Sequence, residues 1–148
     1  MDATFLPLSA SHLDCVIAMM AQLYAHGVGE FDSGRARRAT ERLLAEPEFG
    51  GVWMIVAGGQ PVGYVALVLG FSLEFGGRFG LLDELFVAET WRGLGLGRQA
   101  LEFAAAQCRA RQWSALRLEV ARKNERAQAL YRRSGFASRD CDLMTWWM

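Results

Sequence analysis

The first third of the chain combines one short strand pattern with two helical patterns. Thr4–Leu8 is a short, mostly apolar segment that predicts a first strand. Apolar residues then recur at helical spacing from Ser11, which we expect to cap a helix with Asp14 three residues later, to Gly27. A second helical pattern covers about Ser33 to Glu46 and stops at a proline. The apolar positions expected to face the core are Leu13, Val16, Ile17, Met20, Leu23 and Tyr24 in the first helix and Ala36, Ala39, Leu43 and Leu44 in the second.

The spacing of apolar residues then changes from helical to alternating. Three segments rich in aromatic and β-branched residues follow one another, separated by Gly-Gly pairs or Gly-Gln-Pro. Such segments predict an antiparallel meander of three strands, at about Val52–Ala57, Pro61–Phe75 and Phe79–Val87. The Gly76-Gly77 pair is typical of a hairpin turn between the last two.

After Val87 the pattern becomes helix, strand, helix, strand. The segments are about Gly95–Arg111, Leu116–Val120, Asn124–Ser134 and a last strand near Leu143–Trp147. A strand, a helix and a second strand form a unit whose two strands are normally parallel, so the sheet should be mixed and the fold α/β. The sequence contains neither an internal repeat nor a flexible linker, and we expect a single domain over residues 1–148.

Composition and charge narrow the classes of function. The chain is 52% hydrophobic and 22% charged, and it has no apolar run near the roughly 18 residues of a membrane span. Lys+Arg and Asp+Glu both number 16, so nothing attracts nucleic acid or an anionic membrane in general. The first residues lack the basic and apolar regions of a signal peptide, and the three cysteines are far apart. We expect a cytoplasmic protein with free thiols, in which any anion site is local.

One segment has the composition of a local anion site: Trp91-Arg-Gly-Leu-Gly-Leu-Gly-Arg-Gln-Ala100. Alternate glycines allow positive φ and a close approach of the backbone to a ligand. The segment runs into a predicted helix, whose first amides and dipole favour an anion, typically a phosphate. Arg92 and Arg98 add positive charge.

Two other phosphate-binding motifs compete for this loop. A Walker A loop ends in Gly-Lys-Ser/Thr, whereas Gly97 is followed by Arg and Gln, which excludes it. The dinucleotide fingerprint fits by spacing, as Gly95-x-Gly97-x-x-Ala100, and Glu119 stands where its ribose-binding acid would. Position argues against it, because Ala88–Leu94 separate the glycines from the preceding strand and more than half of the chain comes first.

A third motif includes more residues. The pattern R-x-x-G-x-G follows one strand and precedes a helix, and an N-x(6)-Y arrangement and a Ser-Gly-Phe sequence come later. With these, the chain resembles the GCN5-related N-acetyltransferase superfamily from about Leu81 to Phe136. The resemblance implies a central mixed sheet of about six to seven strands flanked by about four helices, and acetyl-CoA as co-substrate. The motif positions are Arg92, Gly95, Gly97, Asn124, Tyr131 and Ser134–Phe136.

The resemblance also implies how acetyl-CoA would be held. The pyrophosphate would lie on backbone amides of the glycine loop, and the pantetheine would pair with the end of the fourth strand, where that strand parts from the fifth. An amide of Phe86 or Val87 would polarise the thioester carbonyl. Asn124 would contact the nucleotide, or only cap its own helix. The implied positions are Leu85, Phe86, Val87, Arg92, Gly93, Leu94, Gly95, Leu96, Gly97, Arg98, Asn124 and Tyr131, with no metal.

Three residues are candidates for the proton transfers. Tyr131 lies seven residues after Asn124, two turns along the same helical face. A tyrosine there can be core, but the resemblance implies a general acid beside the sulfur. Asp83 and Glu84 would lie on opposite faces of a strand, so only one would enter the cleft. Either could be structural; we favour Glu84 as the base for its reach.

The remaining candidates favour direct transfer. Cys108 falls on the inward face of its helix and indicates core packing rather than an acyl-carrying nucleophile, which favours attack within a ternary complex. His12 and His26 are expected to be solvated surface groups. The last strand would turn Trp146 and Trp147 to opposite faces, and an exposed tryptophan there would suggest a homodimer.

The acceptor is expected to be a primary amine, with a small molecule favoured over a protein terminus or lysine. Its site would be built from the first two helices and the hairpin around the third and fourth strands, where aromatic side chains serve either a pocket or the core. These side chains, with one carboxylate, are Phe71, Glu74, Phe75 and Phe79. The alternative function is a non-catalytic module that binds or senses acyl-CoA, which would need neither an acid nor a base near the sulfur.

Overall fold

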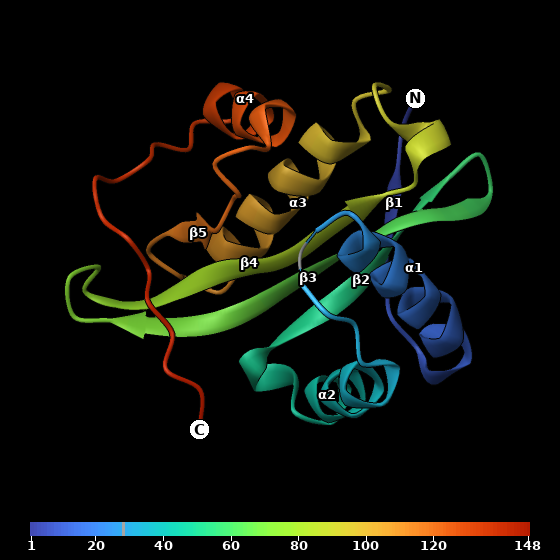
Figure 1. Cartoon of the computed structure of the whole chain (residues 1–148), viewed down its shortest axis with the longest axis horizontal. Helices are drawn as coiled ribbons and strands as arrows, with labels where there is room; N and C mark the ends of the chain where they lie inside the picture. Colours follow the sequence, from blue (N-terminus) through green and yellow to red (C-terminus); the bar gives the residue numbers. More distant parts are fainter. Residues whose placement is uncertain (28) are drawn as a thin grey trace.

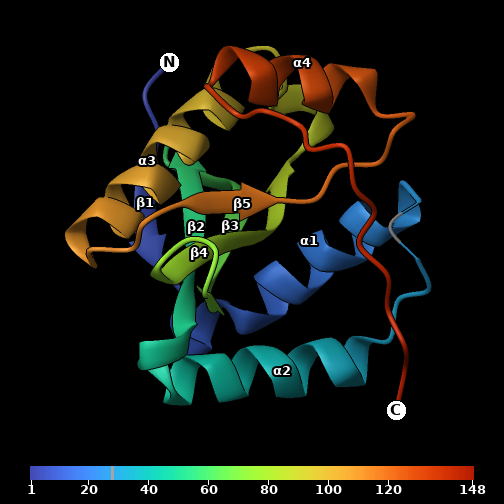
Figure 2. The same cartoon turned by 90° about the vertical axis from the view of Figure 1, so that its left-hand side faces the viewer.

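The structure, a computed structural model, describes residues 1–27 and 29–148 and forms one mixed sheet between two pairs of helices (Figure 1). Helices α1 and α2 cover one face, and α3 and α4 lie on the other (Figure 2). The predicted α/β class is therefore confirmed. The helices are α1 (Leu13–Ala25), α2 (Ser33–Ala45), α3 (Leu96–Ala110) and α4 (Glu125–Arg133), and the strands are β1 (Thr4–Pro7), β2 (Gly50–Ala57), β3 (Gln60–Ser72), β4 (Gly77–Val87) and β5 (Leu116–Leu118).

The sheet has the order β1-β2-β3-β4-β5 and changes from antiparallel to parallel at its last pair. Strands β4 and β5 pair at three positions, from Gly80 opposite Leu116 to Leu82 opposite Leu118. Strand β4 then continues to Val87, while β5 has ended. The long free end of β4 leaves one edge of its backbone without a strand partner.

A β-bulge in β4 reverses the alternation of its side chains. Ala66 pairs with Glu84 but Leu67 pairs with Leu82, so Asp83 is an extra residue on β4. Leu82 consequently packs in the core under α3, whereas Phe86, four residues on, packs under α1. In a regular strand these two would share a face. The prediction that Asp83 and Glu84 lie on opposite faces assumed regular alternation, which the bulge interrupts at Asp83.

The two helices before the sheet match the predicted spacing with two differences. A short 3-10 helix, Ala10–His12, precedes α1, and the side chain of Ser11 does not cap the helix as predicted. On α2, Thr40 is buried in place of the predicted Ala39. Its hydroxyl donates to the Ala36 carbonyl at 2.8 Å, and this hydrogen bond offsets the free-energy cost of burying a polar group. Asp32 caps α2 by accepting from the Arg35 amide at 2.9 Å.

The chain after α4 adds no strand in the described residues, so the predicted strand at Leu143–Trp147 is wrong and the sheet has five strands rather than six to seven. Residues of the tail are tied elsewhere: Arg139 pairs with Glu74 on the β3–β4 turn, and Asp142 pairs with Arg122. The last residues run past the hairpin rather than beside β5 (Figure 1). Their apolar side chains, all exposed, are Leu143, Met144, Trp146, Trp147 and Met148. No helix in the described residues is long and apolar enough to cross a membrane.

The contact between β4 and α3 depends on one glycine. A Cβ on Gly80 would lie 2.5 Å from the Cys108 sulfur and 3.1 Å from Leu67 Cδ1. We expect Gly80→Ala to lower the free energy of unfolding by about 1–3 kcal/mol, the usual cost of overpacking a core. In a Cys108→Ala background the same substitution should cost clearly less, because the nearest obstructing atom is gone. Urea denaturation of the four proteins of this cycle measures the difference, and equal costs in both backgrounds would contradict the packing assignment.

Candidate functional site

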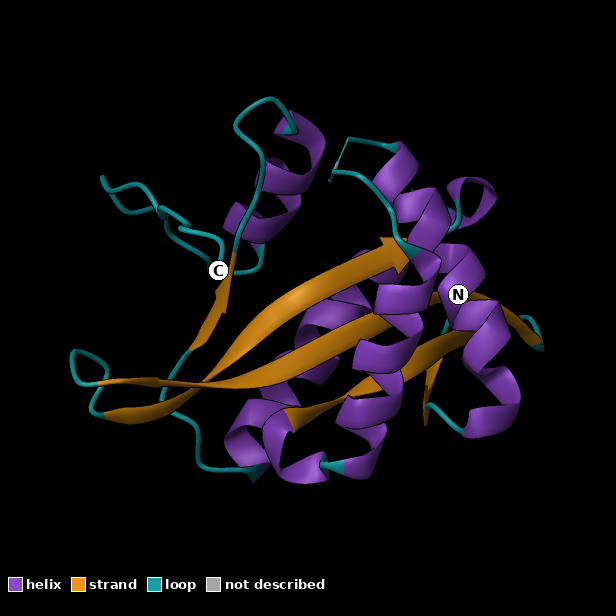
Figure 3. Ribbon diagram, turned by 60° about the horizontal axis from the view of Figure 1, so that its bottom comes forward, coloured by secondary structure: helices purple, strands orange, loops and turns teal. Residues whose placement is uncertain are grey.

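An open groove of about 2270 Å³ begins where β4 and β5 part. Its walls are the free end of β4, the loop before α3, the face of α4 and the first residues of the tail. Figure 3 shows the strands of the sheet with helices in front of them and behind them. Leu23 and His26 at the end of α1 line it as well. The groove therefore brings together segments that are far apart in the sequence.

Two different structural features explain why the loop has glycine at three positions. Gly93 and Gly95 have φ of 85° and 84°, in the left-handed region that favours glycine. A Cβ at Gly95 would meet no atom closer than 4.0 Å, so packing of the protein itself does not demand a glycine there. Gly97 is already helical, and its Cβ would lie 3.1 Å from Leu130 of α4. Gly97 thus sets the close approach of α3 and α4.

The two arginines expected to add charge to the loop are both engaged with protein groups. Arg92 Nε donates to the Val87 carbonyl at 2.8 Å, and its guanidinium lies 5.9 Å from the centre of the Phe86 ring. Arg98 Nε donates to Glu102 at 2.8 Å. Arg92 keeps its positive charge beside the loop, because its acceptor is a neutral carbonyl, whereas Glu102 offsets the charge of Arg98. The first amides of α3, which lack intrahelical partners, and the helix dipole add to the attraction for an anion.

Arg126 is a residue near the loop that sequence reasoning missed. It lies on the first turn of α4, and its guanidinium Nη2 is 3.9 Å from where a Cβ of Gly93 would stand. Its one signal in the sequence is its place two residues after the motif asparagine, but only the packing of α4 beside the loop makes this place meaningful.

The free end of β4 directs alternate backbone groups into the groove. The Ala88 amide donates to Val62 on β3 at 2.8 Å, so Phe86, two residues earlier, also directs its backbone groups to β3. Leu85 and Val87 direct theirs to the other side, where β5 has ended. Of the three consecutive residues expected to pair with pantetheine, Leu85 and Val87 therefore direct backbone groups toward the groove, and Phe86 directs its own to β3.

The motif residues of α4 lie along the groove. Asn124 caps the helix by accepting from the Ala127 amide at 3.1 Å, which confirms the capping interpretation. Tyr131 also lines the groove, and its half-buried ring meets Phe136 edge to face with 5.9 Å between ring centres. Burial raises the pKa of the Tyr131 hydroxyl, which keeps it protonated and able to donate a proton across the neutral range.

Glu84 is held by two phenols from different elements. Tyr24 of α1 donates to Oε1 at 3.0 Å, and Tyr64 of β3 donates to Oε2 at 2.8 Å. Burial raises the pKa of the Glu84 carboxyl; the two hydrogen bonds lower it, and the nearby charge of Asp83 raises it further. A carboxylate with a raised pKa and a fixed orientation suits a general base. Neither tyrosine was identified from the sequence as part of the site.

Asp83 lies on the side of β4 that faces β5. It lines a small cavity of about 70 Å³ with Leu81, Leu82 and Glu119. Partial desolvation, followed by the charge of Glu119, raises the pKa of the Asp83 carboxyl. The structure thus separates the environments of the two carboxylates predicted from the sequence.

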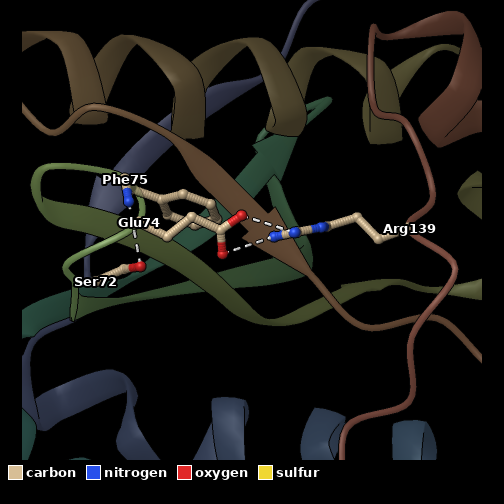
Figure 4. A network of polar contacts seen from close by, with 4 residues as sticks. All are labelled: Ser72, Glu74, Phe75 and Arg139. Atoms are coloured by element: carbon tan, nitrogen blue, oxygen red, sulfur yellow. Dashed lines mark hydrogen bonds and ion pairs between the residues drawn. The ribbon is translucent and has the colours of Figure 1, made fainter.

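The hairpin between β3 and β4 contributes a pair of aromatic rings that lie beside the guanidinium of an arginine. Phe75 and Phe79 meet edge to face at 5.3 Å, and the Arg117 guanidinium lies 5.3 Å and 5.8 Å from their ring centres. Both rings line the groove, whereas Phe71 is exposed. At the hairpin turn, Glu74 receives both terminal nitrogens of Arg139, at 2.7 Å and 3.1 Å (Figure 4). The tail is thereby joined to the hairpin beside this end of the groove.

The histidines and Cys108 fall where the sequence placed them. Both histidines are exposed, although His26 lines the groove near the end of α1. Cys108 is buried among Trp113, Leu82 and other residues under α3, and burial raises the pKa of its thiol. A buried thiol that is held neutral is a poor nucleophile, so the interpretation as packing is confirmed.

A comparison with protein families matches residues 18–136 to the acetyltransferase (GNAT) family. The chain belongs to this family. The resemblance inferred from the glycine loop, Asn124 and Tyr131 is therefore confirmed, and acetyl transfer is the general class of activity. No curated protein matches the chain significantly.

Solved structures share the fold over nearly the whole chain. An integron cassette protein from the mobile metagenome of Cole Harbour Salt Marsh is 30% identical, with a TM-score of 0.85 over 97% of this chain and 90% of that one. A predicted acetyltransferase of Clostridium acetobutylicum, solved with acetyl-CoA, is 16% identical, with a TM-score of 0.81 over 97% and 96%. An aminoglycoside 6'-N-acetyltransferase of Acinetobacter haemolyticus is 15% identical, with a TM-score of 0.80 over 100% and 99%.

The residues of this GNAT chain fit the co-substrate that the family uses. Acetyl-CoA carries a pyrophosphate, an extended pantetheine with amide groups, and a thioester. The start of α3 presents unpaired amides behind two left-handed glycines, and β4 presents a free edge at Leu85 and Val87. Along one groove, the amides at the start of α3 suit the pyrophosphate, and the edge of β4 suits the pantetheine amides.

The loop assignment can be tested at Gly95 with a control at Gly59. Gly95→Glu should abolish acetyl-CoA binding in calorimetric titration, because it adds bulk and negative charge where the pyrophosphate would lie. Gly59, in the β2–β3 turn, has a similar φ of 75° and equally open surroundings, so Gly59→Glu carries the same backbone strain and charge away from the groove. The control should bind like the unmodified protein. NAD and ATP serve as competing ligands, and unchanged acetyl-CoA affinity in Gly95→Glu would contradict the assignment.

Proposed function

We propose that this GNAT protein transfers acetyl from acetyl-CoA to a small primary amine by direct attack within a ternary complex. The observation that carries the proposal is the parting of β4 from β5 beside the glycine loop. The half-buried phenol of Tyr131 lines the groove beside that gap, and one residue before Leu85 the carboxylate of Glu84 is fixed by two hydrogen bonds. A module that only binds acyl-CoA would have no use for these two groups.

Glu84 is proposed as the general base. An ammonium acceptor must lose one proton to become a nucleophile, and the Glu84 carboxylate would take it, becoming a neutral carboxyl. The nitrogen then bonds to the acetyl carbon, the carbon–sulfur bond breaks, and the second proton leaves the nitrogen as the amide forms. Burial beside Asp83 raises the pKa of Glu84, which brings this base closer to the basicity that the step requires.

Tyr131 is proposed as the general acid. The departing thiolate needs one proton, which the Tyr131 hydroxyl would supply and later regain from solvent. The net change is one ammonium and one thioester giving one amide, one thiol and one released proton. The Val87 amide supports the same step, because it faces the groove and can donate to the carbonyl oxygen on which negative charge develops.

A small amine is favoured as acceptor by the shape and charge around the far end of the groove. The groove is lined by Leu23 and His26 at the end of α1 and by the aromatic pair Phe75 and Phe79 of the β3–β4 hairpin. The tail is joined to the hairpin there by Arg139 and Glu74, which encloses the space on one side. The neutral overall charge provides no long-range attraction for a charged macromolecule.

The activity itself is tested by thiol release from acetyl-CoA with a panel of amines. Spermidine, kanamycin, tryptamine, glycine and a short peptide with a free N-terminus sample the main classes. Turnover with a small amine above the peptide supports the proposal. Tight acetyl-CoA binding with no turnover across the panel would favour the binding module, and turnover with the peptide alone would favour a protein acceptor.

Removal of the Tyr131 hydroxyl should lower turnover with little effect on acetyl-CoA affinity. We expect Tyr131→Phe to reduce kcat by roughly 10² to 10⁴, the usual contribution of a general acid. Phe136→Leu is the matched control, because it removes the ring partner of Tyr131 and keeps the hydroxyl. The control should lose far less activity. Equal losses in both variants would indicate that Tyr131 acts through packing.

The pH dependence should report Glu84. The base works only when ionised, and its pKa is raised, so kcat/KM should rise with pH through a midpoint above the ordinary glutamate value of about 4.3. Glu84→Gln keeps the shape and should lower kcat/KM by roughly 10² to 10⁴ and remove that acidic limb. Asp83→Asn is the comparison. If it removes the limb and Glu84→Gln does not, then Asp83 is the base.

A further inference from the structure

Helix α1 reaches the proposed base through one hydroxyl. Each oxygen of Glu84 accepts a single phenolic hydrogen bond, from Tyr24 to Oε1 and from Tyr64 to Oε2. The donors come from different layers, since Tyr24 belongs to α1 and Tyr64 to β3. Two donors on two oxygens fix both the position of the carboxylate and its rotation about the last bond.

The two tyrosine donors differ in how deeply they are buried. Tyr64 is fully buried, with 0% of its surface exposed, and its ring stacks on Phe86 at 6.1 Å between centres. Tyr24 is half-buried near the C-terminal end of α1, one residue after Leu23 and two before His26, both of which line the groove. Its ring packs against Phe31, beyond the α1–α2 connection, at 5.3 Å. Tyr64 thus anchors one oxygen within the core, and Tyr24 holds the other from the C-terminal end of α1.

We infer that Tyr24 is a positioning residue that holds Oε1 of Glu84 from helix α1 and sets the basicity of this carboxylate. The inference rests on the proposed role of Glu84 as the base. It assigns to the α1–α2 region a direct part in the chemistry, beyond forming the wall of an acceptor site. Phe31 fixes the ring of Tyr24 by contact alone and makes no polar contact with the carboxylate.

The direction of the effect on basicity follows from the groups around Glu84. Tyr24 and Tyr64 donate to it, Asp83 adds a like charge from β4, and Glu119 on the β5 side acts on Asp83. Burial and the charge of Glu84 raise the pKa of Tyr24 to about 12, so this phenol remains a donor at every pH at which the protein would work. A donor stabilises the ionised carboxylate, so loss of the Tyr24 hydroxyl must raise the pKa of Glu84.

The test compares Tyr24→Phe with Phe31→Leu in the full chain. A ¹³C-carboxyl NMR titration follows Glu84 in the free protein, with its signal assigned by its absence in Glu84→Gln. Tyr24→Phe, which keeps the ring, should raise the titration midpoint by about one pH unit. The acidic limb of kcat/KM, measured with the fastest amine of the panel, should move upward equally. Phe31→Leu loosens the ring but keeps the hydroxyl, and should leave the midpoint where it is.

The outcomes separate this inference from the proposed function. An unchanged midpoint and acidic limb in Tyr24→Phe, with Glu84→Gln inactive, would overturn the role of Tyr24 and leave Glu84 as the base. A midpoint that shifts equally in Phe31→Leu would overturn it too, because ring packing would then be the cause. Full turnover in Glu84→Gln would overturn the base itself and, with it, the positioning role.

Discussion

The site depends on the parting of β4 from β5 after three paired residues. Had β5 continued beside β4, the backbone groups of Leu85 and Val87 would be used within the sheet, as buried backbone groups almost always are. Because β5 ends at Leu118, these groups face the groove instead. The pairing before the gap is held firmly, since Gly80 lets the edge of β4 pack tightly against Cys108. The tightly packed, paired part of β4 therefore supports the unpaired part that borders the groove.

The bulge at Asp83 gives the same strand a second function. Beyond it, the side chains of β4 change faces, so Glu84 joins the layer under α1 while Leu85 packs with the layer under α3. The proposed base is thus supported by Tyr24 and Tyr64 on one side of the sheet. The proposed acid, Tyr131, comes from α4 on the other side. In the proposed reaction these groups from the two sides would act on one substrate at the gap, where β5 no longer pairs with β4.

Much of the co-substrate side could be predicted from the sequence, because it depends on local chemistry. Glycines at 93 and 95, a helix start and an asparagine cap are short-range features whose geometry the chain determines within a few residues. The bulge could not be predicted, since a register shift depends on the pairing of two strands and leaves no mark in either sequence. The partners of Glu84 were missed for a similar reason, as Tyr24 lies sixty residues away in the chain. The tail was predicted as a strand from its apolar residues alone, but no strand of the sheet pairs with it among the described residues, and its ion pairs at Arg139 and Asp142 are exposed and weak.

The division between backbone and side chains has a consequence for specificity. The groove would hold acetyl-CoA largely through amides of β4 and α3, and backbone groups are kept whatever side chains the sequence carries, provided that the glycines remain. The proposed acceptor end would be built from side chains of α1, the β3–β4 hairpin and the tail that line the groove, such as His26, Phe75 and Arg139. Substitutions there can change the acceptor without disturbing the co-substrate. Tyr24 belongs to α1 and contacts the proposed base, so a change of acceptor that moves α1 would also change the chemistry.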